Sequence, residues 1–293
     1  MKHCLLIAAL LVVMGGSAQA AVLFSNGFET DTAGWNVFGA PFDATRVASG
    51  TNGITSASGS WHAESGGGSV NATGAAGNWG GYNFGAGSVP GIPFQEYRTS
   101  SQVYLNVTGG FANDTRFDYS SAINEIATGG HRRDFVFNVG FYNSADVTGP
   151  GAGTDRFVVS ASNGAGRANA FPKNPGRDPI AIDQDGWYTF EHHFYDDGGV
   201  LAVDLNIFDD TNSLVGTWTL SDPSDLIGLI SGNRYGWFAL QEFGVFAFDN
   251  TFLETIEAQQ VPIPEPTSLA IWGIGGLGMW FGAKRRRQRS QAA

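Results

Sequence analysis

The segment from Tyr188 to Ile207, Tyr-Thr-Phe-Glu-His-His-Phe-Tyr-Asp-Asp-Gly-Gly-Val-Leu-Ala-Val-Asp-Leu-Asn-Ile, decides the fold class. On both sides of its centre, apolar or aromatic residues recur at every second position, which is typical of half-buried β-strands. The Asp-Asp-Gly-Gly sequence at 196–199 is typical of a tight hairpin turn, which needs residues that accept positive φ. The segment therefore predicts two antiparallel strands joined by a short turn.

The same alternation recurs at residues 102–108 and 135–141, and another strand is expected over 214–220, after a polar turn at 209–212. The stretch 49–91, rich in Gly, Ser, Ala and Asn, is expected to form long loops between short strands. No segment before the C-terminal tail shows a convincing helical stripe. Residues 21–257 are therefore predicted to form one all-β domain, an antiparallel β-sandwich of the jelly-roll type.

The N-terminus has the pattern of a secretory signal peptide over residues 1–20. Lys2 and His3 precede the apolar run 5–14, and Ala18-Gln19-Ala20 gives a small-residue cleavage site. We expect a signal peptidase to cut between Ala20 and Ala21. Cys4, the only cysteine, lies in this peptide, so the exported part is predicted to use neither disulfides nor thiol chemistry.

The C-terminus combines an apolar stretch with a basic stop. Residues 267–283 carry no charge and would form a helix of about 25 Å, the short end of the spanning range. The basic residues 284–287 place that end in the cytoplasm, so the domain and its linker, 258–263, would lie on the other side of the membrane.

Pro264-Glu265-Pro266, followed at once by this span and the arginine cluster, resembles the PEP-CTERM sorting signal of Gram-negative bacteria, here residues 264–287. The resemblance implies recognition by an exosortase, cleavage near the motif, and delivery to the outer surface or the extracellular matrix. It also implies a link to exopolysaccharide. The span would then be a transient inner-membrane anchor, and whether it is retained stays open.

The region between the two targeting signals is strongly acidic. Residues 21–264 contain 26 acidic and 10 basic residues, a formal charge of −16. Because nucleic-acid affinity depends on cations that neutralise phosphates, this charge argues against a nucleic-acid partner. It suits a soluble extracellular protein and divalent cations.

A second resemblance lies at the two ends of the predicted domain. Asn26-Gly27-Phe28-Glu29 with Gly34-Trp35, and Phe246-Ala247-Phe248-Asp249-Asn250, resemble the opening and closing strands of jelly-roll carbohydrate-binding modules and concanavalin A-like sandwiches. The resemblance implies that the first and last strands pair. It also implies that Glu29 and Asp249 help to hold a structural calcium ion. In the alternative reading, both acids simply flank strand ends at the surface.

No catalytic motif is present: neither Gly-x-Ser-x-Gly, His-Glu-x-x-His, a P-loop, nor the Glu-x-Asp-x-x-Glu of sandwich glucanases occurs. His192 is predicted to pack in the core, and residues 131–134 to form a turn with local ion pairs. Trp79 and Tyr82, in a Gly-rich stretch, are the candidate exposed aromatics for a sugar ligand. The first hypothesis is a non-enzymatic surface or matrix protein with polysaccharide as its candidate ligand, and the alternative is a polysaccharide hydrolase or lyase.

Overall fold

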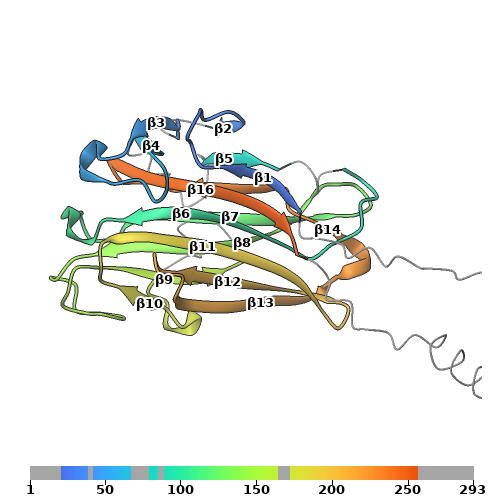
Figure 1. The fold of residues 1–293 in the computed structure, drawn as a ribbon. Coiled ribbons are helices and arrows are strands. Elements are labelled where there is room, and N and C mark those ends of the chain that lie inside the picture. Colours follow the sequence, from blue (N-terminus) through green and yellow to red (C-terminus); the bar gives the residue numbers. More distant parts are fainter. Residues whose placement is uncertain (1–20, 39–41, 67–78, 85–88, 164–171, 257–293) are drawn as a thin grey trace, which may run out of the picture. The chain divides into compact units, whose positions relative to one another are not determined.

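A computed structural model describes residues 21–38, 42–66, 79–84, 89–163 and 172–256 (Figure 1). The chain divides into a unit that ends at Ile256 and a second unit, Glu257–Ala293. The predicted signal peptide, the sorting motif at 264–266 and the span at 267–283 all lie outside the described residues. Within the described residues, no helix is long and apolar enough to cross a membrane.

The described strands form two antiparallel sheets, so the predicted antiparallel sandwich is confirmed. Sheet A, which faces the viewer in Figure 1, has the order β13-β12-β11-β6-β16-β4-β3, with β1 also paired to β16. Its strands are β1 (Val22–Asn26), β3 (Thr45–Ala48), β4 (Trp61–Gly66), β6 (Tyr97–Leu105), β11 (Gly186–Asp197), β12 (Val200–Phe208), β13 (Leu214–Leu226) and β16 (Val245–Thr255).

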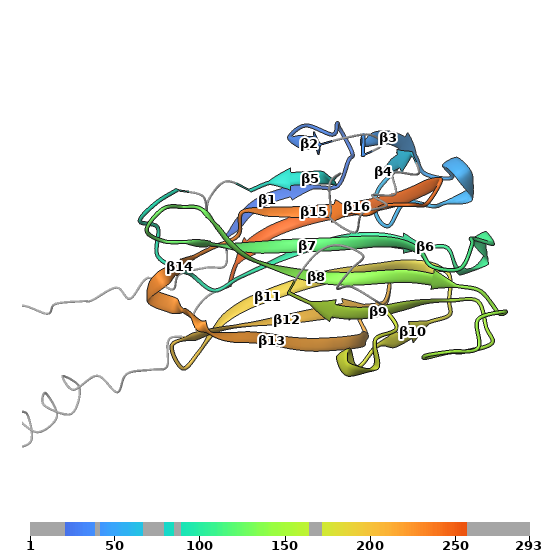
Figure 2. The ribbon, with the colours of Figure 1, turned by 180° about the vertical axis from the view of Figure 1, so that it is seen from behind.

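Sheet B faces the viewer in Figure 2 and has the order β10-β9-β8-β7-β15-β5-β2, with β14 paired to β7. Its strands are β2 (Trp35–Phe38), β5 (Trp79–Asn83), β7 (Thr115–Glu125), β8 (His131–Tyr142), β9 (Arg156–Ser162), β10 (Ile180–Ile182), β14 (Ile230–Ser231) and β15 (Tyr235–Ala239). Short 3-10 turns lie at Thr51–Gly53, Val107–Gly109, Pro175–Arg177 and Ile227–Leu229.

The core lies between the two sheets and is rich in phenylalanine. Alternate residues of β8, among them Phe135, Phe137 and Phe141, meet alternate residues of β11 and β16, among them Phe190 and Phe248. Each of these rings is at most 1% exposed. Since burial of an aromatic side chain is worth about 1.5–3 kcal/mol, this shared layer is what holds the two sheets together.

The hairpin predicted from the opening segment is present. Asp197 of β11 pairs with Val200 of β12 in register, and Gly198 and Gly199 have φ values of +66° and +95°. His192 is fully buried, with Nε2 3.0 Å from the Phe135 carbonyl oxygen, which confirms its predicted place in the core. Burial lowers the pKa of His192 to about 3, so the imidazole is neutral at physiological pH.

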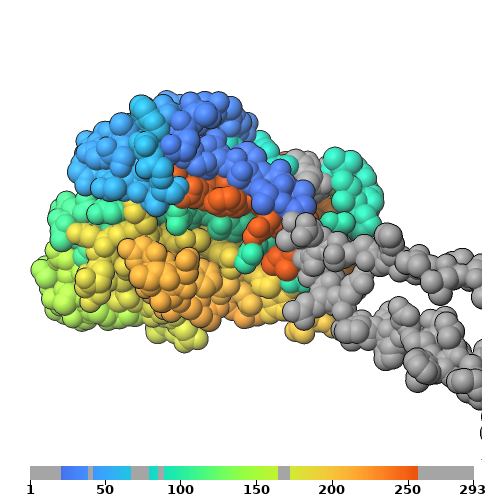
Figure 3. All heavy atoms as spheres, viewed as in Figure 1, coloured from blue at the N-terminus to red at the C-terminus, as the bar shows by residue number. Residues whose placement is uncertain are grey.

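The first and last strands pair, as the resemblance to carbohydrate-binding modules implied. Asn26 of β1 lies opposite Thr251 of β16, and the Thr255 N–H donates to the Ala21 carbonyl at 2.9 Å. In Figure 3 the blue N-terminal segment lies directly against the orange β16. This pairing brings residues near 29 into the neighbourhood of residues near 249.

The prediction of a turn at residues 131–134 is wrong, whereas one predicted local ion pair is present, with His131 Nε2 3.2 Å from Asp134 Oδ1. These residues begin β8, and Arg132 and Arg133 pair chiefly with Asp225 at the far end of β13. A pairing between such distant residues leaves no trace in the local sequence pattern.

Candidate functional site

The face of sheet B that points away from the core is polar along its central strands. Asp118 of β7, Asn138 of β8 and Ser160 of β9 lie side by side in register, and Ser120 lies two residues beyond Asp118. These four side chains, together with Ser162, form the polar row. The first four are at most 4% exposed although they face away from the apolar interior. Because buried polar groups are costly unless paired, hydrogen bonding within the row is expected.

Hydrogen bonds do run across the polar row from strand to strand. Asn138 Nδ2 donates to Asp118 Oδ1 at 3.0 Å, and Ser162 Oγ donates to Asn138 Oδ1 at 2.7 Å. Arg177, which follows β9 in the chain, donates from Nη1 to the same Asn138 oxygen at 3.3 Å. Ser160 Oγ has no hydrogen-bond partner among the described residues. The row therefore holds carboxylate, amide and hydroxyl groups in fixed positions, and the Ser160 hydroxyl forms no hydrogen bond with the described residues.

Five stacked rings, called here the aromatic ladder, lie on the same outer face. In order they are Phe38 of β2, Trp79 of β5, Trp237 and Tyr235 of β15, and His131 of β8 (strands in Figure 2). Successive rings are tilted by only 13°, 8°, 9° and 9°, and the Trp79 and Trp237 centroids are 3.9 Å apart. The register places Trp237 opposite Ser120, so the ladder borders the polar row.

The ladder has two features that a purely packed cluster does not need. Phe38, its outermost ring on β2, is 59% exposed. Trp237 Nε1 is buried and has no hydrogen-bond partner among the described residues. A buried indole N–H normally finds an acceptor, so this group is a candidate donor to a ligand.

Only one of the two predicted ligand-binding aromatics lies on this face. Trp79 belongs to the ladder, in a strand and not in a loop. Tyr82 points to the opposite side of the same strand and is 2% exposed, with its hydroxyl accepting from Asn26 Nδ2 at 2.9 Å. The prediction that Tyr82 is exposed is therefore wrong, because residues three apart on a strand face opposite sides.

Trp237 and Tyr235 were not identified from the sequence as candidate ligand-binding residues. The pattern Tyr-Gly-Trp at 235–237 shows that the two rings share a face, but it does not show whether that face is inside or outside. Only the pairing of β15 with β5 brings Trp237 to Trp79.

A pocket of about 440 Å³ opens where β7 begins and β8 ends, at one end of the same outer face. Its walls include Asp114, Arg116 and Tyr142, with Lys173 and Asn174 from the segment that follows β9. Tyr142 Oη donates to Asp114 Oδ1 at 2.8 Å, and the Lys173 ammonium lies 4.1 Å from the centre of the Tyr142 ring. The pocket thus combines an aromatic wall with several polar groups, which is the usual composition of a small-ligand site.

The charges in this pocket are compensated in pairs. Arg116 Nη2 lies 2.6 Å from Asp114 Oδ1, and Lys173 Nζ lies 2.6 Å from Asp146 Oδ2. Lys173, with Thr148 and Arg156, holds the pKa of Asp146 well below its usual range, so this pair is ionised at any physiological pH. A pocket with balanced charge selects for hydrogen-bonding groups and not for a ligand of one sign.

The two predicted calcium ligands meet at one loop. Glu29 Oε1 accepts from the Ser60 and Trp61 N–H groups at 3.0 and 3.1 Å, and Asp249 Oδ2 accepts from the Ala57 N–H at 3.1 Å. A Cβ atom at Gly59, whose φ is +61°, would lie 2.2 Å from Glu29 Oε1, so glycine is needed there.

These residues fit a divalent cation in charge and in donor type. No basic side chain of the described residues is in an ion pair with either carboxylate; Arg46 donates to the Glu29 backbone carbonyl instead. Burial, with a further contribution from Glu29, raises the pKa of Asp249 to about 6. The described residues contain no group of three or more His, Cys, Asp or Glu side chains placed for a metal, so Glu29 and Asp249 would bind Ca²⁺ together with backbone carbonyls or water.

We expect calcium to stabilise the domain through these two carboxylates. At a hundredfold excess over its Kd, Ca²⁺ should add about 2.7 kcal/mol and raise the Tm by several degrees at pH 7, as measured by calorimetry. Without metal, the folded-state pKa of Asp249 exceeds its unfolded value, so its stabilising contribution is complete below about pH 4 and is lost as pH rises through about 6.

The Asp249→Asn variant should remove both effects, the response to calcium and this pH dependence. Asp183→Asn, a change at an exposed acid just before β11, is the matched control and should leave both intact. An unchanged Tm after addition of Ca²⁺ or of chelator would contradict the calcium site.

A further polar chain lies beneath the same loop on the outer face of sheet A. Ser56 Oγ is 3.0 Å from His62 Nδ1, and His62 Nε2 is 3.3 Å from Glu64 Oε1. Each of the three is at most 9% exposed. The neighbouring cavity of about 250 Å³ is lined by Ile54 and Tyr104 but not by Ser56 or His62. This serine–histidine–glutamate chain therefore ties the loop to β4 and does not face a substrate space.

No protein-family model matches the chain, and no curated protein gives a significant match. Similar solved structures include the CBM2 module of the evolved Dit protein of Lactobacillus casei BL23 phage J-1, at 10% identity and a TM-score of 0.40, covering 81% of this chain and 97% of the module. Peanut lectin in complex with a peptide is 10% identical, with a TM-score of 0.39 and coverage of 83% and 100%. The beta-porphyranase BpGH16B from Bacteroides plebeius is 8% identical, with a TM-score of 0.34 and coverage of 83% and 93%.

Proposed function

We propose that the protein is an exported cell-surface or matrix component that binds a neutral polysaccharide through the outer face of sheet B. The observation that supports this proposal most directly is the aromatic ladder on this face, whose outermost ring, Phe38, is 59% exposed; the polar row beside it is buried. Sugar rings present apolar C–H faces, and these faces pack on aromatic rings at the surface of a protein. The acidic surface disfavours an anionic polysaccharide by like-charge repulsion.

Asp118 and Asp134 on this face are assigned to hydrogen bonds within the sheet and not to catalysis. Asp118 accepts from Asn138, and Asp134 is bonded to Tyr235 and lies 3.4 Å from Ser120 Oγ. Asp118 lies opposite Asn138, and Asp134 lies opposite Ala122, which puts their Cα atoms about 13 Å apart along the strands. This register does not by itself create a close carboxylate pair. A polysaccharide hydrolase or lyase is therefore the alternative hypothesis and not the proposed function.

The binding proposal predicts that Trp79→Ala and Phe38→Ala each weaken polysaccharide binding by about tenfold or more. Losing an aromatic contact of this kind costs on the order of 1.5 kcal/mol, and 1.4 kcal/mol corresponds to a factor of ten. Affinity electrophoresis of the full chain against a panel of neutral polysaccharides measures the change.

Phe252→Ala is the matched control, because Phe252 is 38% exposed on β16 of the other sheet. It should bind as the unchanged chain does. Equal affinity for all three variants would place the binding surface elsewhere, and absence of retardation by every polysaccharide would reject the proposed function. Release of reducing sugar from any member of the panel would favour the enzymatic alternative.

The targeting part of the proposal rests on the tail and the N-terminal peptide. A signal peptidase would act between Ala20 and Ala21, and an exosortase would process the chain near Pro264-Glu265-Pro266 while the 267–283 span holds it in the inner membrane. Replacing the three motif residues by alanine is expected to leave the full-length chain in the inner-membrane fraction, as seen by immunoblotting. Unchanged processing and surface delivery would refute this sorting route.

A further inference from the structure

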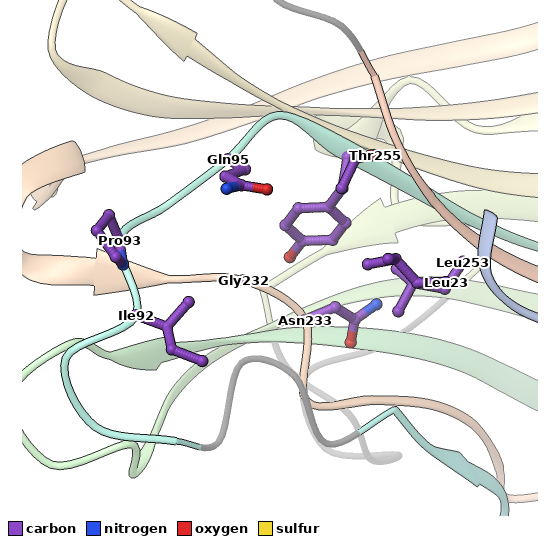
Figure 4. Close-up of a pocket in the computed structure, with 9 residues that line it drawn as sticks. Leu23, Ile92, Pro93, Gln95, Gly232, Asn233, Leu253 and Thr255 are labelled. Atoms are coloured by element: carbon purple, nitrogen blue, oxygen red, sulfur yellow. The ribbon is translucent and has the colours of Figure 1, made fainter. Parts of the chain in front are cut away.

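Another pocket, of about 90 Å³, lies at the end of the sandwich where β1 begins and β16 ends (Figure 4). Ile92 and Pro93 lie on one side of it, and Leu23 and Leu253 lie on the other. None of the side chains that line it is charged. Its volume suits a group of a few heavy atoms and is too small to enclose a sugar ring.

Two buried polar atoms of this pocket have no hydrogen-bond partner among the described residues: Tyr97 Oη and Asn233 Oδ1. Tyr97 and Asn233 are each 3% exposed. The Tyr97 ring is fixed by stacking on Phe194, with centroids 4.4 Å apart, and Asn233 Nδ2 donates to Ser121 Oγ at 2.6 Å. Since unpaired buried polar atoms are rare and costly, a hydroxyl and an amide oxygen held this firmly suggest a bound partner.

The two atoms and the walls define the chemistry of that partner. Tyr97 Oη can donate a proton to an acceptor, whereas Asn233 Oδ1 can only accept one. A partner that uses both atoms carries an acceptor and a donor, and the uncharged, partly apolar lining favours one with no net charge and with a small apolar part facing the leucines. An acetamido group meets all three conditions through its carbonyl oxygen, its N–H and its methyl group.

We propose that this pocket receives the acetamido group of an N-acetylated sugar, with the sugar ring remaining outside. The inference rests on the proposed function in that it takes the ligand to be a polysaccharide, and it narrows the ligand class. It uses residues that belong to neither the aromatic ladder nor the polar row, so the two sites can be tested separately.

Saturation-transfer NMR of the full chain with N-acetylglucosamine, glucose and acetamide tests the inference. The acetyl methyl group of N-acetylglucosamine and the methyl group of acetamide should receive saturation, and glucose should receive none at this pocket. Tyr97→Phe removes only the hydroxyl and should weaken the response by about three- to tenfold, the usual loss for one hydrogen bond. Tyr195→Phe, which removes a hydroxyl bonded to Asp204 on the surface, is the control and should change nothing.

Gly232→Ala is a second variant that fills the pocket without straining the fold. Its Cβ would lie 3.5 Å from Tyr97 Cε1, an ordinary contact, and should reduce the response as well. Equal saturation of glucose and N-acetylglucosamine, or unchanged responses in both Tyr97→Phe and Gly232→Ala, would overturn the inference. So would the absence of any saturation, which would mean that the pocket binds only water. None of these outcomes would affect the Trp79-dependent retardation of the protein by polysaccharide in affinity electrophoresis. The proposed function can therefore hold even if this inference fails.

Discussion

Replacing Arg156 by methionine is expected to lower the free energy of unfolding by about 3–5 kcal/mol, the range for breaking a buried charged network from one side. Arg156 is fully buried at the start of β9. Its guanidinium donates to the carbonyls of Thr148, Pro150 and Thr154 at 2.8–2.9 Å and to the carboxylate of Asp146. Methionine keeps the apolar stem and leaves these acceptors without their donor. The loop between β8 and β9 would therefore lose the hydrogen bonds that hold it together.

Urea unfolding followed by tryptophan fluorescence measures the Arg156 effect. Arg98→Met is the matched control, because the Arg98 side chain is 46% exposed and its ion pairs with Glu191 and Glu254 lie at the surface. It should cost less than about 1 kcal/mol. Equal costs for the two substitutions would show that the buried network contributes no more than a surface pair.

Asp225→Asn is expected to destabilise the protein by a similar amount, about 3–5 kcal/mol. The Asp225 carboxylate is 1% exposed and accepts from Arg132 Nε and Arg133 Nε, each at 2.6 Å. Asparagine has nearly the same shape but no charge, so Arg132 and Arg133 would lose the buried anion that they share and would keep only their more exposed partners, Glu125 and Asp222. These contacts join the end of β13 in sheet A to the start of β8 in sheet B, so the substitution should also loosen the attachment of that end of β13.

Calorimetry with hydrogen exchange distinguishes the two parts of the Asp225 prediction. The Tm should fall, and amides near Ser224 and Arg132 should exchange faster than those of the β11–β12 hairpin. Asp222→Asn is the control, because Asp222 also contacts Arg133 but its side chain is 34% exposed. A Tm equal to that of the control would rule out a structural role for the Asp225 bridge.

The strands were predictable from the sequence because their signal is local. The alternation over 188–207 arises because each strand has one apolar face, which is a property of the strand's own residues. The structure has β11, the turn and β12 at those positions. The buried position of His192 follows from the same periodicity, since it shares a face with Phe190 and Phe194. The same rule, applied at Tyr82, shows that it and Trp79 cannot share a face.

The candidate sites were only partly predictable. Glu29 and Asp249 were nominated through a resemblance, and their meeting at one loop follows from the pairing of β1 with β16. The polar row could not be read from the sequence, because Asp118, Asn138 and Ser160 come from three strands and become neighbours only in register. The Asp225 bridge and the pocket lined by Tyr97 and Asn233 likewise join residues from distant parts of the chain.

The sequence by itself determined the class of fold, the polar and apolar faces of its strands, its acidic charge and the absence of cysteine from the region after residue 20. Only the tertiary structure decided which faces point outward and which residues meet there, as when Trp79 stacks on Trp237 across β5 and β15. The physical reason is the sequence separation over which each kind of information acts. Periodicity reports on neighbours a few residues apart, whereas a binding face depends on the register of strands distant in sequence, which is set by the packing of the whole sandwich.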